Sequence, residues 1–331
     1  MDPITHAISG IAMARAMPKH PLPKQQVVFL ALLTMAPDAD IILTFFSDTV
    51  YLRYHRGITH SLLMLPLWTW MFYSLIPGRR HLQPVMPWLI GTALLMHIFL
   101  DLITSFGTMI LAPLSDWRAT LDLVFIVDPI FTALLLIPLL LTLIWKYRAR
   151  YMALTALALA ATYVVLTAYA HQQALQLAHA KQPQAQSVSA LPLPFSPFHW
   201  QLIAIFPDHY RRTAVDLLPA FPGSSVFFTD QFTAPHLGAL RGQENLHWQR
   251  LKRMDDVLLP EGIPGVAFYR WFARFPVLLS KDKQQMEFGD LRFGAGFAGA
   301  DSPFRLQLVL KTHPQAWLVW GDDRKSLLHD P

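Results

Sequence analysis

The chain has 331 residues, of which 53% are hydrophobic and only 15% are charged. This composition is too apolar for an average soluble protein and indicates a membrane protein. The net charge of +5 comes from short basic loops and not from a basic stripe with interleaved aromatic residues, so nucleic acid is not an expected partner. Cysteine is absent, which excludes disulfides and thiolate metal sites and leaves histidine and carboxylate groups as the metal ligands.

Six apolar segments fill the first half of the chain, and we read them as the helices of a multi-span membrane domain. They cover residues 4–17, 25–46, 61–76, 86–111, 129–145 and 151–170. A spanning helix needs about 17–25 residues, so the first and third segments are short for this role. Pro37 interrupts the second segment and predicts a local break in its helix.

The charges of the loops predict how these segments are oriented. Basic residues gather in residues 15–24, 79–80 and 146–150, and short loops of this kind stay in the cytoplasm. The alternate loops, 47–59 and 112–128, carry three Arg and the acidic residues Asp48, Asp116, Asp122 and Asp128. We therefore expect the alternate loops and the C-terminal half of the chain to lie on the outer side of the membrane.

The fourth segment contains an imidazole and a carboxylate. His97 and Asp101 are four residues apart, so they share one face of the helix at membrane depth. Ionisable groups inside a membrane are usually functional. The alternative is a structural His–Asp pair that only satisfies its own hydrogen bonds.

Further candidate ligands come from three other segments, all predicted toward the outer side. They are His6 in THAISG, Asp38 and Asp40 in APDAD, and His55 and His60 in HRGITHS. Each segment alone could be an ordinary turn or helix cap. Together with the histidine and the aspartate of the fourth segment, they predict one shared site for a divalent metal, with zinc expected and manganese or magnesium as alternatives. A pair of carboxylates can bridge two ions, so the site holds one or two.

The loop before the fifth segment adds three candidate catalytic residues. Arg118 could bind an anionic group such as phosphate, and Asp122 or Asp128 could act as a general base or ligand. The alternative for Arg118 is a surface ion pair with Asp116 or Asp122, which contributes little. Asp128 precedes Pro129, which fixes it at the entry of the next helix.

These motifs, in this order along residues 1 to about 170, resemble a family of membrane-bound, metal-dependent hydrolases that is also labelled LexA-binding and inner-membrane-associated. THAISG, APDAD, HRGITHS, HIFLDLITSFGT and DLVFIVDP carry the likeness. The resemblance implies a bacterial inner-membrane protein with a periplasmic C-terminal domain. It places His6, Asp38, Asp40, His55, His60, His97 and Asp101 on the family's metal motif, and Asp122 and Asp128 on its closing acidic motif. The HxxxD element is also similar to that of zinc-dependent phospholipase C enzymes.

The C-terminal half is predicted to be a separate soluble domain. Residues 173–194 are polar and of low complexity, which is typical of a linker between a membrane domain at 1–172 and a domain at 195–331. Short runs rich in Val, Phe, Trp and Tyr predict β-strands. They lie at residues 200–206, 224–230, 265–280, 286–294, 304–311 and 316–322. The fold class is therefore an α-helical multi-span membrane domain followed by a small, mainly β soluble domain.

Two functions fit these features. The favoured one is an inner-membrane hydrolase in which a metal-activated water attacks an ester or phosphoester of a lipid or envelope molecule. The alternative is a membrane transporter or ion-handling protein with an intramembrane His/Asp relay. A relay needs polar groups through the full membrane depth, whereas the last two apolar segments have few. Membrane lipid is the expected partner, and the sequence indicates no particular protein partner.

Overall fold

The computed structural model describes residues 1–76, 84–218, 243, 246–259, 262–263, 265–293, 303–310, 314–320 and 324–328. The chain divides into two compact units. The helical unit consists of Met1–Ile42 and Tyr54–Ala168, and the sheet unit consists of Leu43–Arg53 and Tyr169–Pro331. A helical N-terminal region is thus followed by a mainly β C-terminal region, as the sequence predicts.

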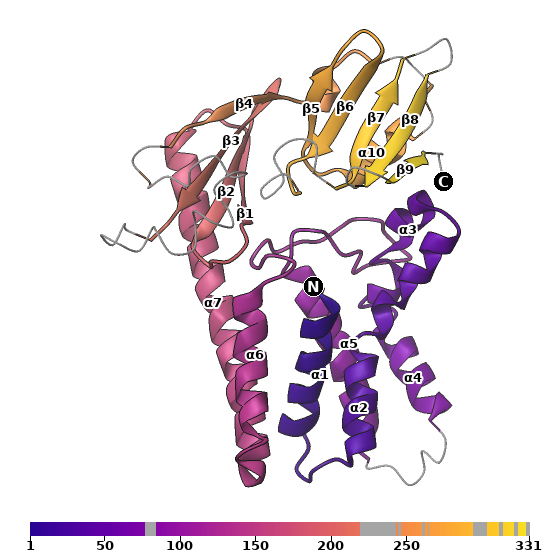
Figure 1. Ribbon diagram of the computed structural model, residues 1–331, viewed down its shortest axis with the longest axis vertical. Helices are drawn as coiled ribbons and strands as arrows, with labels where there is room; N and C mark the ends of the chain where they lie inside the picture. The colour runs from indigo at the N-terminus through magenta and orange to yellow at the C-terminus, as the bar shows by residue number, and fades with distance from the viewer. Residues whose placement is uncertain are drawn as a thin grey trace. The chain divides into compact units, whose positions relative to one another are not determined.

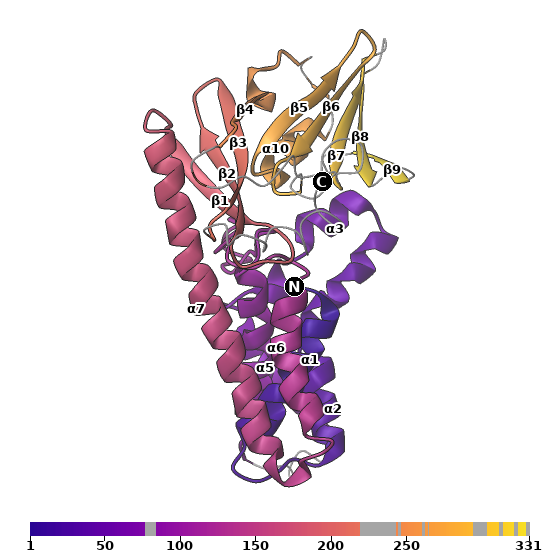
Figure 2. The same cartoon turned by 60° about the vertical axis from the view of Figure 1, so that its left-hand side comes forward.

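The helical unit is built around its first helix. Its elements are α1 (Pro3–Ala16), α2 (Lys24–Leu33), most of the 3₁₀ helix η1 (Ala36–Phe45), the 3₁₀ helix η2 (Ile58–His60), α4 (Leu65–Leu75), α5 (Met86–Leu102), α6 (Pro129–Leu141), η4 (Lys146–Arg148) and the first part of α7 (Ala149–Lys181). Helix α1 packs against α2, α5 and α6, and α5 also packs against α2 and α4. Figures 1 and 2 show α1, α2, α5 and α6 side by side.

Two apolar cores lie on different sides of α1. One joins Met13 of α1 to Leu30 of α2 and Leu89 of α5. The other joins Ala12 of α1 to Phe131 of α6, and it also includes the small residues of α7. Small side chains let membrane helices approach closely. Where α1 and α2 meet, a Cβ on Gly10 would lie 2.5 Å from Thr34 Oγ1 and 3.0 Å from the Ala31 Cα atom.

One described helix is long and apolar enough to cross a membrane, and it is α7. Its 33 residues reach about 50 Å at ~1.5 Å per residue, whereas a bilayer core is about 30 Å thick. Helix α2 and η1 together form a second candidate, bent by 50° after Thr34 and Met35. The remaining apolar helices α5 and α6 are shorter than a full span, so the number of spans stays a prediction.

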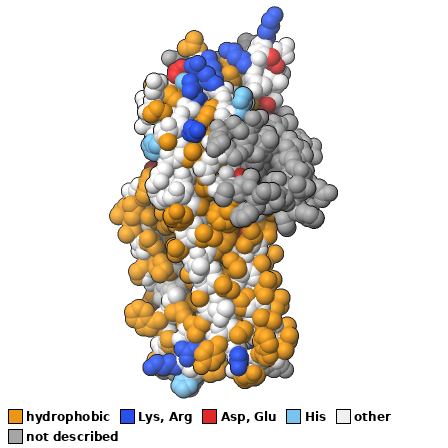
Figure 3. All heavy atoms as spheres, turned by 90° about the vertical axis from the view of Figure 1, so that its left-hand side faces the viewer, with side chains coloured by type: hydrophobic (Ala, Val, Ile, Leu, Met, Phe, Trp, Pro, Cys, Tyr) orange, Lys and Arg blue, Asp and Glu red, His pale blue; other side chains and the backbone are white. Residues whose placement is uncertain are grey.

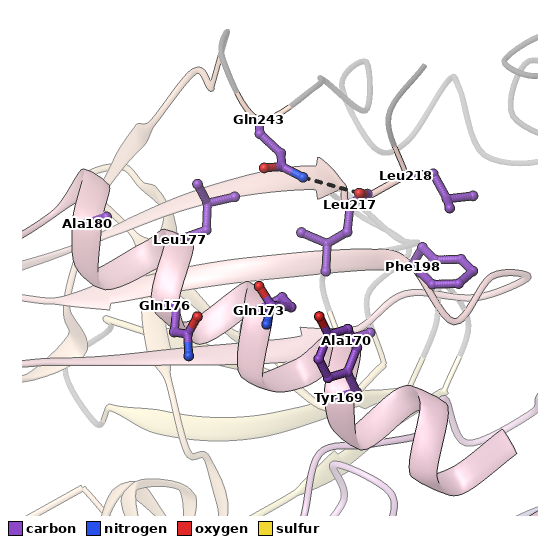
Figure 4. A pocket seen from close by; sticks show the side chains of 10 residues that line it. All are labelled: Tyr169, Ala170, Gln173, Gln176, Leu177, Ala180, Phe198, Leu217, Leu218 and Gln243. Atoms are coloured by element: carbon purple, nitrogen blue, oxygen red, sulfur yellow. Dashed lines mark hydrogen bonds between the residues drawn. The ribbon is translucent and has the colours of Figure 1, made fainter. Parts of the chain in front are cut away.

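The surface of the helical unit is apolar on the face drawn in Figure 3, where hydrophobic side chains cover the helices and Lys and Arg side chains gather at one end. Val165 and Leu143 are among the exposed large hydrophobic residues. The connections from α1 to α2 and from α6 to α7 lie at the same end (Figure 1), and these loops are basic. This arrangement agrees with the predicted clustering of basic loops on one side.

The sheet unit contains two antiparallel sheets. The first has the order β1 (Ser187–Pro192), β2 (His199–Ile205), β3 (His209–Asp216) and β4 (Gln249–Lys252), and the second has β5 (Pro276–Lys281), β6 (Gln285–Asp290), β7 (Arg305–Val309), β8 (Gln315–Trp320) and β9 (Arg324–Leu327). The other elements are α3 (Asp48–Tyr54), whose last residue is counted in the helical unit, η5 (Met254–Asp256) and α10 (Val266–Phe272).

The end of α7 supports the first sheet. Ala170 and Ala174, one turn apart, pack with Ala178 against Trp200 and Val215. The structure therefore has helix and strand in much of residues 173–194, where the sequence predicted a linker. The polar composition suggested a linker, but alanine and glutamine also form good helices.

A second difference lies in residues 265–280. We expected one strand, but the first part forms α10, and only Pro276–Lys281 forms β5. Phe268 and Phe272 are both buried and four residues apart, which is a helical spacing. The aromatic composition favoured a strand, but the helical spacing of these two residues agrees with the helix in the structure. The predicted strand at 224–230 lies outside the described residues.

Candidate metal centre

Four side chains from three parts of the helical unit bring their ligand atoms to one place. They are Asp38 of η1, His60 of η2, and His97 and Asp101 of α5. One ligand atom from each lies within 4.8 Å of the others. The i,i+4 spacing puts the two α5 residues on one helix face. The predicted break at Pro37 is confirmed, since a 3₁₀ segment and a bend follow α2 there and carry the first aspartate.

The spacing of these four atoms is that of a metal-ligand set. His60 Nε2 lies 2.9 Å from His97 Nε2 and 3.1 Å from Asp101 Oδ2. His97 Nε2 lies 3.4 Å from Asp101 Oδ2. Asp38 Oδ1 is 3.4 Å from His60 Nε2 and 3.6 Å from His97 Nε2. An ion that binds four atoms tetrahedrally at ~2.0–2.1 Å holds them about 3.3 Å apart, which matches this range.

A hydrogen bond on its far side fixes the tautomer of His97. Its Nδ1 lies 2.6 Å from the carbonyl oxygen of Thr34. Because a carbonyl can only accept, Nδ1 must carry the hydrogen. In the neutral ring, Nε2 therefore presents its lone pair to the cluster.

His60 is oriented by a similar chain of hydrogen bonds. The Thr59 hydroxyl donates to Asp40 Oδ2 at 3.1 Å, so its oxygen is left to accept. His60 Nδ1, 2.9 Å from this oxygen, is then the donor. The Nε2 atom of His60 also turns a lone pair toward the cluster when the ring is neutral.

Two lone pairs and two carboxylate oxygens therefore face one another, and such an arrangement is repulsive unless a positive charge lies among them. Burial alone would lower the pKa of His60, but hydrogen bonds and charges of Asp101 and Asp38 raise it above its usual value. The cluster thus attracts either a proton or a cation. Its donor set of nitrogen and oxygen atoms fits a divalent ion such as zinc.

His6 borders the cluster, and its ring makes no hydrogen bond among the described residues. Its ring stacks on His97 with centroids 3.9 Å apart, and its side chain is fully buried. Both ring nitrogens lack a hydrogen-bond partner among the described residues. Nε2 lies 3.4 Å from Asp101 Oδ1, which also contacts the amino group of Met1. A buried imidazole without partners is costly in an apolar protein, and coordination to a cation would satisfy one nitrogen.

A second group overlaps the first through Asp38. Asp38, Asp40 and His55 can also bring ligand atoms within 4.8 Å of one another. Both carboxylate oxygens of Asp40 already have partners. Oδ1 is 2.8 Å from His55 Nδ1, and Oδ2 accepts from the Thr59 hydroxyl and from the Arg56 backbone. Burial lowers the pKa of His55 more than Asp40 raises it, so the ring is neutral at neutral pH.

One side of the cluster is open to solvent. The Asp38 side chain is 24% exposed and that of His55 is 12% exposed. The side chains of His60, His97 and Asp101 are fully buried. Among the described residues, water or a substrate can therefore reach the cluster where Asp38 and His55 lie.

Sequence reasoning missed Arg56, although it stands inside HRGITHS. This arginine is 3% exposed, and Nη2 lies 2.9 Å from Asp101 Oδ1. Nη1 donates to the Thr104 hydroxyl at 3.1 Å and to the Asp101 carbonyl at 3.4 Å. A basic residue next to His55 looked like a loop charge, so only its burial could have revealed it. Thr34 and Thr59 were missed as well, because a threonine that orients an imidazole has no distinctive sequence pattern.

The structure places Arg118 beside this region. Its Nη2 lies 3.4 Å from the carbonyl oxygen of His55. The guanidinium carbons of Arg118 and Arg56 lie 5.1 and 4.9 Å from the ring centre of Phe106. Asp122 is buried, has a left-handed backbone with φ of 54°, and accepts from the Thr120 hydroxyl at 3.3 Å. The catalytic roles of both predicted residues stay predictions.

Asp128 has a clear structural place. Its Oδ1 caps α6 by accepting from the backbone of Ile130 and Phe131, each at 2.9 Å. Its Oδ2 accepts from the Tyr163 hydroxyl at 2.7 Å. Burial raises the pKa of this carboxyl despite these hydrogen bonds. None of the hydrogen bonds that Asp128 makes among the described residues reaches the cluster, and its predicted catalytic role stays a prediction.

Comparison with known proteins places the helical region in a family. Residues 1–174 match the family described as YdjM inner membrane protein. Over 140 residues the chain is 30% identical to the "Uncharacterized protein YfhP" of Bacillus subtilis (strain 168), an alignment that covers 39% of this chain and 42% of that relative. The chain thus matches less than half of that relative's length. No solved structure matches the chain. Because the family match covers more than half of its residues, the chain belongs to the YdjM inner membrane protein family.

Proposed function

We propose that this protein is an inner-membrane, metal-dependent hydrolase that cleaves an ester or phosphoester of a lipid or envelope molecule. The observation that carries the proposal is the convergence of Asp38, His60, His97 and Asp101, with ligand atoms 2.9–3.6 Å apart in the five pairs measured. A divalent ion held there would polarise the bond to be cleaved and make a water molecule more acidic. The cluster supports the hydrolase part of the family resemblance.

The charges of the cluster bear on how many ions it holds. Three carboxylates, those of Asp38, Asp40 and Asp101, stand against the guanidinium of Arg56. With neutral histidines and a neutral Met1 amino group, the formal charge is negative by two, which one divalent ion balances. A second ion at Asp38, Asp40 and His55 would make the site positive and suit it to an anionic phosphoester.

Arg118 is the residue that we propose to bind the anionic part of the substrate. It hydrogen-bonds to the backbone of His55, at the open side of the cluster. A guanidinium binds phosphate oxygens through two parallel hydrogen bonds. Asp122, four residues later, is the proposed acidic partner in proton transfer.

Exposed apolar residues next to the cluster support a substrate borne by lipid. The Ser61 hydroxyl donates to the Ala112 carbonyl, and the Leu62 backbone donates to Ile110, so the segment after His60 is joined to the loop at 108–114. On this loop Leu114 is 84% exposed, and Trp117 nearby is 58% exposed. Tryptophan is typical of the membrane–water interface, where a lipid headgroup would meet the site.

The first test is the metal content of the purified full chain in detergent. We expect one or two divalent ions per chain, and we expect His97→Ala and Asp101→Asn to lose them. His20→Ala, at an exposed loop residue, and Asp216→Asn, in the sheet unit, are matched controls that should keep the metal. A wild-type chain without metal, or full retention in both cluster variants, would contradict the proposal.

The second test separates hydrolysis from transport. The metal-loaded protein in detergent should release product from a panel of lipid phosphoesters, and the activity should fall with the metal content of the variants. Activity that appears only as ion flux in sealed vesicles would instead favour the relay. The compact form of the cluster supports hydrolysis, since a relay needs groups spread across the membrane.

A further inference from the structure

We propose that Arg56 is a positioning residue that limits Asp101 to one oxygen as a metal ligand and so keeps a coordination position free. The inference rests on the metal centre proposed above. It concerns a residue that touches no proposed substrate and acts through a ligand.

The two oxygens of Asp101 have different partners. Oδ1 lies 2.9 Å from Nη2 of Arg56. Oδ2 lies 3.1 Å from His60 Nε2 and 3.4 Å from His97 Nε2, and it has no hydrogen-bond donor among the described residues. The carboxylate is fully buried, so solvent cannot engage either oxygen. Oδ2 is thus the oxygen turned to the cluster, while Oδ1 is held by the guanidinium and by the amino group of Met1.

The guanidinium is itself fixed on both sides. Nη1 donates to the Thr104 hydroxyl at 3.1 Å and contacts the Asp101 carbonyl, while the Phe106 ring lies 4.9 Å from the guanidinium carbon. Its planar fork can reach the side chain and the backbone of the same aspartate, which a single ammonium nitrogen cannot do. The guanidinium therefore holds Asp101 through both its side chain and its backbone, and its positive charge lies against Oδ1.

The backbone of Arg56 links this contact to the other part of the cluster. Its φ of 59° is left-handed, which is unfavourable for a residue other than glycine. The backbone N–H donates to Asp40 Oδ2 at 3.1 Å, and the carbonyl accepts from the Met109 N–H at 2.8 Å. A strained backbone held by such bonds indicates a position that the surrounding structure requires.

The expected effect follows from what the second oxygen could do. If the guanidinium is removed, Oδ1 keeps the Met1 amino group and His6 Nε2 as neighbours but loses the arginine that holds it, so Asp101 can turn Oδ1 to the ion and bind through both oxygens. The number of ligand atoms then rises, and the loss of one positive charge strengthens cation binding. If Arg56 had a merely structural role, its replacement would loosen the ligands and weaken the affinity for the cation.

The experiment uses the full chain in detergent, loaded with Co²⁺, whose visible absorption weakens as the number of ligand atoms rises. Arg56→Met should bind Co²⁺ equally tightly or several-fold more tightly, with a weaker visible band. Arg56→Lys keeps a positive charge at Oδ1 and should restore most of the wild-type band. Arg148→Met, at the exposed last residue of η4, should match the wild type. Every variant carries its purification tag at the C-terminus, so that the Met1 amino group near Oδ1 is the same in all.

The outcomes distinguish failure of the proposed metal centre from failure of the positioning role of Arg56. If the wild type binds no Co²⁺, the proposed metal centre itself is wrong. If it binds Co²⁺ and Arg56→Met shows an unchanged band, or a weaker affinity with an unchanged band, the positioning role is wrong while the centre stands. Should Arg56→Met fail to fold, Thr104→Val removes one anchor of the guanidinium and should give a smaller weakening of the band. An unchanged band in that variant would then overturn the inference.

Discussion

The two imidazoles at the centre of the cluster show how neighbouring groups determine the chemistry of a side chain. His60 and His97 each use Nδ1 in a hydrogen bond outside the cluster, and each turns Nε2 inward. A buried polar atom without a partner costs about 1–3 kcal/mol. The structure holds several such atoms close together, so a bound cation would stabilise the folded protein as well as act on a substrate.

This stabilisation gives a prediction about metal removal. A ligand that binds only the folded chain stabilises it by about 4 kcal/mol when it is present at ~1,000 times its dissociation constant. We expect chelation to lower the unfolding temperature of the wild type in detergent and zinc to restore it. His97→Ala should show no difference between the two conditions. An unfolding temperature that ignores both chelator and zinc in the wild type would contradict a bound ion.

A prediction about Arg118 concerns substrate binding. A hydrogen bond to a charged group contributes about 1.5–3 kcal/mol, so Arg118→Ala should raise KM for a phosphoester about tenfold to a hundredfold. The metal content should not change, because Arg118 contacts none of the proposed ligand atoms in the hydrogen bonds described. Steady-state kinetics and metal analysis on the same sample check both parts. A fall in kcat alone would argue against a binding role.

Asp128 gives a prediction with a defined pH dependence. Loss of a helix cap costs about 0.5–2 kcal/mol, so Asp128→Ala should destabilise the chain and keep its metal. Asp128→Asn keeps a capping oxygen. Since burial raises the folded-state pKa of Asp128, its contribution to stability is present at low pH and is lost as pH rises through that pKa. The free energy of unfolding of Asp128→Asn, measured with a chemical denaturant, should therefore rise relative to that of the wild type as pH increases from 4 to 7, roughly the range above an ordinary aspartate pKa. The reverse trend would contradict the cause given for the raised pKa.

At the scale of helices, the contact between α1 and α2 connects packing with the cluster. Thr34, against which Gly10 packs, donates its hydroxyl to the His6 carbonyl at 2.9 Å and offers its own carbonyl to His97. A larger residue at position 10 would displace the group that sets the tautomer of His97. The small residue therefore serves both helix packing and ligand orientation.

We expect Gly10→Ala to destabilise the chain by about 1–3 kcal/mol, as overpacking does, and to weaken metal binding. The matched control is Gly91→Ala, where the nearest atom to an added Cβ is Thr69 Oγ1 at 3.3 Å. This second variant should keep wild-type metal affinity. Thermal unfolding and a metal-competition titration measure the two effects. Equal behaviour of the variants would show that the α1–α2 contact does not influence the cluster.

The elements also show what could be read from the sequence. The pairing of His97 with Asp101 and the break at Pro37 were predictable, because both depend on local geometry. The partners of the histidine rings were not, since Thr34 and Thr59 become significant only when distant segments meet. Arg56 was missed for the same reason. In the C-terminal region the runs of aromatic and branched residues predicted β2, β6, β7 and β8, whereas β1, β3, β4 and β9 were not predicted. Helix α10 was mistaken for a strand because its composition outweighed its periodicity.

For the whole molecule, the property to be tested is its orientation in the membrane. The loop with Lys19 and His20 is basic, and the chain contains no cysteine, so single cysteines can report on each side. We expect Asp282→Cys, in an exposed turn of the sheet unit, to react with a membrane-impermeant maleimide in intact cells. His20→Cys should react only after permeabilisation. Labelling in the reverse pattern would overturn the predicted orientation, although it would leave the cluster intact.

The division of the chain also has an evolutionary consequence. Leu43–Arg53 belongs to the sheet unit, where Arg53 lies over Trp271 at 4.0 Å, yet in sequence it separates Asp40 from His55. Recombination that exchanged the C-terminal region between relatives would leave this insert without its original neighbour. Homologues with different C-terminal regions should therefore diverge most within these few residues, even where the histidines and aspartates on either side are shared.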